Sequence, residues 1–172
     1  MRRSLWATMV VLLATGIFLV AGCGGDDDNG NPTGNNGGGS TFSADIDGVS
    51  FTASYGASAT KQEIQGFPTY VNVGGFGPYA GDTCLFALTF EDPTTGTFDM
   101  GSGIIDYVGG LTLAQANEDY ATINGDGNGT VTIGTYNASK ITGTFSFVAY
   151  TNDGQDSVVV TNGVFNLSIM TL

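Results

Sequence analysis

The sequence predicts an all-β fold, a single antiparallel sandwich or barrel of about eight to ten short strands that follows a signal peptide and a flexible linker. From residue 41 onward apolar and polar residues alternate, as they do in strands with one buried face. Turn residues recur roughly every eight to twelve positions, the spacing of short antiparallel strands. Sandwich and barrel both remain open, because both place alternate side chains inward.

The first predicted hairpin spans residues 42–53 and turns at Asp47-Gly48. Asp-Gly suits a two-residue type I′ turn, in which both residues adopt positive φ. All apolar side chains of the hairpin then share one face. The predicted pairs are Ile46 with Val49, Ala44 with Phe51, and Phe42 with Ala53.

The later strands are predicted from apolar runs that end at turn residues. Residues 83–90 are mostly apolar and predict a central strand, which Pro93 and Gly96 terminate. Residues 112–119 are the only stretch with room for a helical turn. Further strands are expected at 130–135, 140–150, 157–161 and 164–170, with a bulge or kink at Asn162-Gly163 between the last two.

The first residues have the pattern of an export signal. Arg2 and Arg3 precede an uncharged apolar run over residues 5–20, and small residues follow. The four residues at the end of this run, Val20-Ala21-Gly22-Cys23, resemble the lipobox of bacterial lipoproteins. The resemblance implies that Cys23 becomes the first residue of the mature protein and carries acyl chains such as palmitate. A plain transmembrane anchor with an incidental cysteine is the alternative.

The predicted organisation has three parts. Residues 1–22 are a lipoprotein signal peptide, 23–40 are the lipidated cysteine with a Gly/Asn/Asp-rich linker, and 41–172 are the β domain. The linker has no large apolar residue and should be a flexible tether that spans roughly 20 to 25 Å as a coil. Gly24 follows the cysteine where an aspartate would retain a lipoprotein at the inner membrane. The family rule then implies an exported protein, lipid-anchored to the cell envelope at the outer membrane.

The β domain carries a second resemblance. Phe42 to Phe51 fits an F-x-A-x-I-D-G-x-x-F/W hairpin, and Thr94 to Phe98 reads T-T-G-T-F. Near the end stand Lys140 to Phe147, KITGTFSF, and Val160 to Phe165, VTNGVF. In this order the motifs resemble a family of uncharacterised bacterial lipoproteins, which implies a lipid-anchored β domain. The family brings no established reaction and no agreed catalytic residues.

Charge and composition exclude several functions. The chain has four Lys or Arg against sixteen Asp or Glu, a net charge of -12. Only Lys61 and Lys140 lie beyond residue 3, so no nucleic acid is expected as a partner. The chain has no histidine, which removes Ser-His-Asp and Cys-His catalysis. No cofactor is expected, and the only candidate metal ligands are Asp126 and Asn128, in a glycine-rich loop that partly matches a calcium loop.

Three further groups have a structural and a functional interpretation. Glu118-Asp119 in one turn and Asp153 with Asp156 in another read as solvated turn carboxylates rather than a catalytic pair. Cys84 lies in an apolar strand and is expected to be a buried thiol. Aromatic residues among glycine and proline either cap the core or offer a surface to a protein or carbohydrate partner. They are Phe67, Tyr70, Phe76 and Tyr79.

The sequence therefore predicts a lipid-anchored cell-envelope protein that is not an enzyme. Its β domain is expected to bind a partner or to serve a structural role, and the membrane is a partner through acylated Cys23. The alternative is a lipocalin-like barrel that carries a small apolar ligand in an internal cavity. An Asp/Glu-dependent hydrolase is a third hypothesis, which would need two carboxylates facing each other in a cleft.

Overall fold

The computed structural model describes residues 39–101, 106–122 and 128–172. Within these ranges the chain forms eleven strands, slightly more than expected, and the all-β prediction is confirmed. Among the same residues, no helix is long and apolar enough to cross a membrane. The strands are β1 (Thr41–Ile46), β2 (Val49–Thr52), β3 (Tyr55–Gln62), β4 (Tyr70–Tyr79), β5 (Asp82–Glu91), β6 (Gly96–Met100), β7 (Tyr107–Leu113), β8 (Glu118–Ala121), β9 (Gly129–Tyr136), β10 (Lys140–Thr151) and β11 (Ser157–Thr171).

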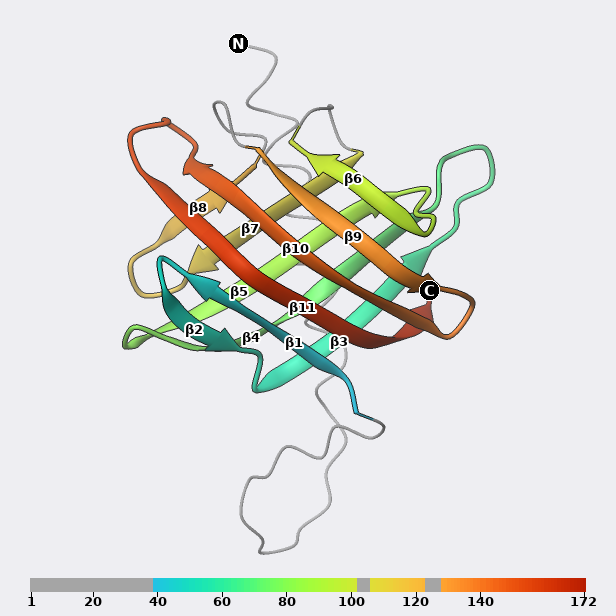
Figure 1. Ribbon diagram of the computed structural model, residues 1–172, viewed down its shortest axis with the longest axis horizontal. Coiled ribbons are helices and arrows are strands. Elements are labelled where there is room, and N and C mark those ends of the chain that lie inside the picture. Colours follow the sequence, from blue (N-terminus) through green and yellow to red (C-terminus); the bar gives the residue numbers. More distant parts are fainter. Residues whose placement is uncertain (1–38, 102–105, 123–127) are drawn as a thin grey trace, which may run out of the picture. The chain divides into compact units, whose positions relative to one another are not determined.

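The strands form one sheet that closes into a ring. Hydrogen bonds link β11, β3, β4, β5, β7, β8 and β10 in that order, and β10 pairs back with β11. From this ring β1 and β2 extend beside β11, and β9 and β6 extend beside β10. Figure 1 shows two layers, in which β2, β1, β11, β10, β9 and β6 cross in front of the other five strands. The domain thus has the facing layers of a sandwich within the closed hydrogen bonding of a barrel.

One pairing departs from the predicted antiparallel sheet. β11 and β3 run parallel, with Ile169 opposite Ala59 and Thr171 opposite Lys61. The other pairs in the described part of the chain are antiparallel. β11 has fifteen residues, and it pairs first with β1 and then, through its last residues, with β3. Its length allows it to close the ring.

Phenylalanine rings fill the space between the layers. Phe42 of β1 lies 5.2 Å from Phe86 of β5, and Phe86 lies 5.5 Å from Phe145 of β10, measured between ring centroids. Phe90 of β5 lies 5.9 Å from Phe165 of β11. The two Phe86 pairs are edge-to-face, an arrangement that aromatic rings favour. Because these contacts join the front layer to the back layer directly, the described core is packed with side chains.

The predicted first hairpin is confirmed. Asp47 and Gly48 have φ values of 49° and 78°, as a type I′ turn requires. The other apolar residues of the hairpin are buried, whereas Val49, next to the turn, is 47% exposed. The observed pairs include Ile46 with Val49 and Ala44 with Phe51, and the Ala53 N–H donates to the Phe42 carbonyl oxygen at 2.9 Å.

The predicted irregularity at Asn162-Gly163 is also confirmed. Asn162 has a φ of 53°, and the register of β11 shifts here against both β1 and β10. A Cβ on Gly163 would lie 2.5 Å from the Phe145 ring, so only glycine leaves room for this core side chain. The two strands expected on either side of the irregularity are therefore one bulged strand. Residues 112–119, where a helical turn was possible, instead form the end of the hairpin of β7 and β8, with the turn at residues 114–117.

Candidate functional site

Two of the predicted site residues, Cys23 and Asp126, lie outside the described residues. Asn128, the second candidate calcium ligand, lies beside β10, where its backbone carbonyl oxygen accepts the Val148 N–H at 2.7 Å. Within the described ranges, no group of three or more His, Cys, Asp or Glu side chains could hold a metal ion.

The four aromatic residues of the predicted partner surface do not lie together. Phe67 is 70% exposed in the loop between β3 and β4. Tyr70 and Tyr79 begin and end β4, so they lie at opposite ends of that strand, and Phe76 lies between them. The Tyr79 hydroxyl donates to the Ile46 carbonyl oxygen at 3.1 Å, and its ring packs against the core. Of the four, Phe67 alone is an exposed side chain at a loop tip.

One end of the domain gathers four turns, on the left of Figure 1: those between β1 and β2, β4 and β5, β7 and β8, and β10 and β11. Hydrogen bonds tie them together. The Gln115 N–H donates to Asp82 Oδ1 at 2.9 Å, and the Val159 N–H donates to Asp47 Oδ1 at 2.8 Å. We call this end the acidic pole; its carboxylates are Asp47, Asp82, Glu118, Asp119, Asp153 and Asp156.

Tyr120 contacts two carboxylates of the acidic pole. Its hydroxyl is 2.9 Å from Glu118 Oε2 and 3.2 Å from Asp156 Oδ2, so it connects β8 to the loop before β11. Tyr120 is 5% exposed, and this burial, together with its bonds to the two carboxylates, raises its pKa above the usual value for tyrosine. The hydroxyl has one hydrogen and can fully donate to only one carboxylate at a time. We call Glu118, Tyr120 and Asp156 the clamp, because they join β8 to the loop before β11, two segments that are distant in sequence.

Other carboxylates of the pole bind backbone N–H groups of the turns. Burial acts to raise the pKa of Asp82, but the N–H groups of Gln115, Ala116 and Thr83 outweigh it and lower that pKa. The Thr151 hydroxyl, followed by the Gln155 N–H, lowers the pKa of Asp153. Carboxylates that satisfy turn N–H groups have a structural task.

The acidic pole lacks the burial that acid catalysis uses. A carboxyl group acts as an acid near neutral pH when a buried, apolar site keeps it protonated. Glu118 and Asp156 converge on one hydroxyl, but both are exposed to solvent. In the described structure, both carboxylates accept from the Tyr120 hydroxyl.

Cys84 is the buried thiol that the sequence predicts. It lies on the inner face of β5 with no exposed surface, and burial, with a smaller contribution from the charge of Asp82, raises its pKa to about 12. Because the raised pKa favours the neutral thiol in the folded state, its contribution to stability is complete below pH 9 and is lost as the pH rises toward 12.

We expect Cys84 in the folded protein to resist alkylation at pH 8. The rise in pKa alone reduces its thiolate fraction roughly a thousandfold relative to the unfolded chain. Iodoacetamide labelling, with the Cys84 peptide quantified by mass spectrometry, should give little modification until denaturant is added. Equal labelling rates with and without denaturant would show that the thiol is accessible.

The sequence did not identify Tyr120 as part of this site. Glu118 and Asp156 are visible as turn carboxylates, but 36 residues separate Tyr120 from Asp156. The sequence signal was a tyrosine placed two residues after a glutamate on a short strand. That pattern is common in sheets, so only the pairing of β8 with β10 shows the convergence.

These features define a class: an all-β domain with a closed two-layered sheet, a filled aromatic core and an acidic pole. The chain belongs to the family described as "Domain of unknown function (DUF6252)", whose model matches residues 39–167. The match begins just before β1 and ends within β11. No curated protein and no solved structure matches the chain.

Proposed function

We propose that this protein is a non-enzymatic β domain, held to the cell envelope by acylated Cys23, that binds a partner or serves a structural role. The observation that carries the proposal is the lipobox-like Val20-Ala21-Gly22-Cys23 at the end of an apolar leader. Two or three acyl chains hold a protein firmly to a bilayer, because each buried CH₂ contributes about 0.8 kcal/mol. Gly24 after the cysteine favours the outer membrane.

The described geometry supports the non-enzymatic interpretation over the two alternatives. A carrier of small apolar ligands needs a cavity between its layers, whereas Phe42, Phe86 and Phe145 contact one another there. A hydrolase needs a carboxyl group in a protective environment, whereas Glu118 and Asp156 are exposed. Both points favour a function at the surface of the domain.

Metabolic labelling with a radioactive fatty acid tests the anchor. The unmodified chain should incorporate label, and Cys23→Ser should incorporate none. Cys84→Ser is the matched control, because it removes the other cysteine and should leave labelling unchanged. Label that persists in Cys23→Ser would refute acylation at this position.

A further inference from the structure

The end of the domain opposite the acidic pole carries both lysines of the β domain. Lys140 begins β10 and lies opposite Ser168, and Lys61 lies opposite Thr171 near the end of β11. Four carboxylates also lie at this end: Glu63 pairs with Lys61, Asp92 accepts a backbone N–H, and Glu91 and Asp106 lie near Tyr70. Among the described residues, the acidic pole thus has six carboxylates and no lysine, whereas the opposite end has four carboxylates and both lysines, so the acidic pole is the more negative end.

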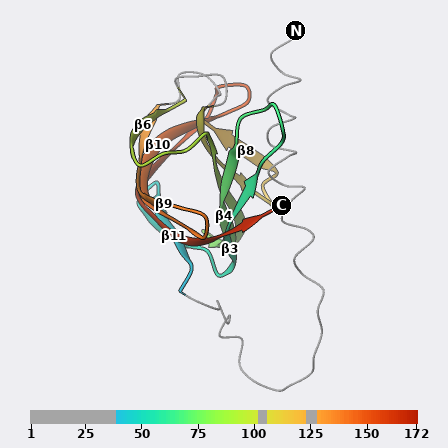
Figure 2. The same cartoon turned by 90° about the vertical axis from the view of Figure 1, so that its right-hand side faces the viewer.

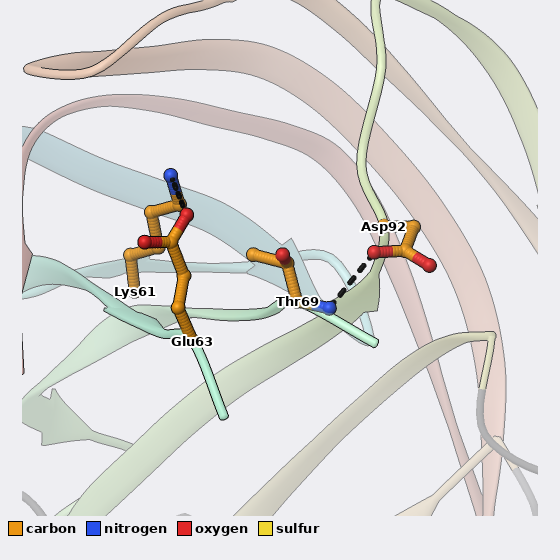
Figure 3. Close-up of polar contacts among 4 residues, drawn as sticks. All are labelled: Lys61, Glu63, Thr69 and Asp92. Carbon is orange, nitrogen blue, oxygen red and sulfur yellow. Dashed lines mark hydrogen bonds and ion pairs between the residues drawn. The ribbon is translucent and has the colours of Figure 1, made fainter. Parts of the chain in front are cut away.

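Several large apolar side chains are exposed at this lysine-bearing end. In Figure 3 the β3–β4 loop is held where it starts by the Lys61–Glu63 ion pair, at 2.5 Å, and where it ends by the Thr69 N–H, which donates to Asp92 Oδ1 at 2.8 Å. Between these two fixed points the loop presents large apolar side chains to solvent. We call the exposed residues here the apolar tip: Ile64 (59% exposed), Phe67 (70%), and the adjacent C-terminal Leu172 (65%), whose N–H donates to the Lys61 carbonyl oxygen.

The segment that leads to Cys23 joins the domain on the same side. Ser40 precedes β1, and its Oγ accepts the Ser168 N–H at 3.4 Å, close to the end of β11. In Figure 1 the end of β11 and the β3–β4 loop lie on the right, opposite the acidic pole, and β1 starts at the bottom, somewhat right of the middle. Figure 2 looks onto this side. A tether with a coil length of roughly 20 to 25 Å would keep this side of the domain close to an anchoring membrane.

We propose that the apolar tip lies in the interface of the anchoring lipid bilayer, with the acidic pole pointing away from it. This inference rests on the proposed acylation of Cys23. Phe and Leu side chains favour the boundary between headgroups and acyl chains. Lys140 is compatible with lipid phosphates, whereas Lys61 pairs with Glu63. The carboxylates of the opposite pole are repelled by an anionic bilayer surface, which favours the same orientation. The tip thus acts as a second, non-covalent contact with the membrane.

Tryptophan fluorescence tests this orientation in the complete lipoprotein. Trp6 is the only tryptophan and lies in the predicted leader, so Phe67→Trp would make position 67 the sole fluorophore after processing. The exposed position should tolerate the change. Val159→Trp is the matched control, since Val159 is 46% exposed and lies at the acidic pole. Both proteins are purified from membranes, checked by mass for acylation, and reconstituted into phosphatidylethanolamine and phosphatidylcholine vesicles with or without brominated lipid.

The proposal predicts that brominated lipid quenches the tryptophan at position 67 about twofold or more and leaves position 159 nearly unchanged. If the protein is acylated and neither position is quenched, the tip does not enter the bilayer, while the proposed anchor stands. Equal quenching at both positions would overturn the orientation. Protein that reaches the membrane without acyl chains on Cys23 would overturn the proposed anchor, and with it this inference.

Discussion

Replacing Phe86 with alanine is expected to lower the free energy of unfolding by about 3 to 5 kcal/mol, enough to unfold much of the protein at physiological temperature. Phe86 is fully buried on β5, in the back layer, and contacts four rings of the front layer. Its centroid distances are 5.2 Å to Phe42, 5.5 Å to Phe145, 5.7 Å to Phe51 and 5.8 Å to Phe147. Truncation therefore opens a cavity where the two layers meet. Urea unfolding monitored by circular dichroism measures the loss.

Phe67→Ala is the control for this prediction. It deletes the same ring from a side chain that is 70% exposed, so the expected change is within about 0.5 kcal/mol. A Phe86→Ala protein that loses less than about 1 kcal/mol would contradict the filled core, because it would mean that the ring makes few contacts to lose.

Gly143→Ala is expected to have the second largest effect, a loss of about 2 to 3 kcal/mol or failure to fold. A Cβ at this position of β10 would lie 2.3 Å from the Thr132 carbonyl oxygen and 2.4 Å from the Phe165 ring. The carbonyl belongs to the backbone of β9 and cannot rotate away, so the added methyl group must separate the strands. Thermal unfolding of the two proteins measures the difference.

Gly134→Ala provides a matched control on the neighbouring strand. There the nearest atom to an added Cβ is Thr142 Oγ1 at 3.5 Å, an ordinary contact, and the site is exposed. We expect a change within about 0.5 kcal/mol. If both alanine variants were equally stable, the close approach of β9 to Gly143 would be wrong.

The parts of the fold that could be predicted depend on local signals. Asp47-Gly48 specifies its turn, and the alternation on either side of it specifies which residues pair. Asn162-Gly163 marks the bulge in the same way, because these residues tolerate the unusual backbone geometry. The central strand over residues 83–90 was visible from its apolar run and appears within β5.

The closure of the sheet could not be predicted, because it depends on contacts between distant residues. The parallel pairing of Ile169 with Ala59 joins segments that are more than a hundred residues apart, and no local pattern encodes it. β4 was not predicted as a strand, since its glycines interrupt the alternation that identifies strands. In the structure Gly74 and Gly77 lie where a Cβ would meet the backbone of a neighbouring strand, so glycine is needed there.

In the candidate site, too, the features with a local sequence signal could be predicted, and those that depend on contacts between distant residues could not. Cys84 was predicted to be buried from its apolar neighbours alone, and it is. The clamp of Glu118, Tyr120 and Asp156 depends on which turns meet at one end of the closed sheet. The apolar tip likewise needs the parallel pairing of β11 with β3, which brings Leu172 beside Lys61.

The central claim is that Cys23 anchors this domain to the envelope membrane, and mass spectrometry of the protein purified from membranes tests it most directly. We predict an N-terminal peptide that begins at Cys23 and carries the added mass of acyl chains, with residues 1–22 removed. A protein that retains residues 1–22 and has an unmodified Cys23 thiol would contradict this account.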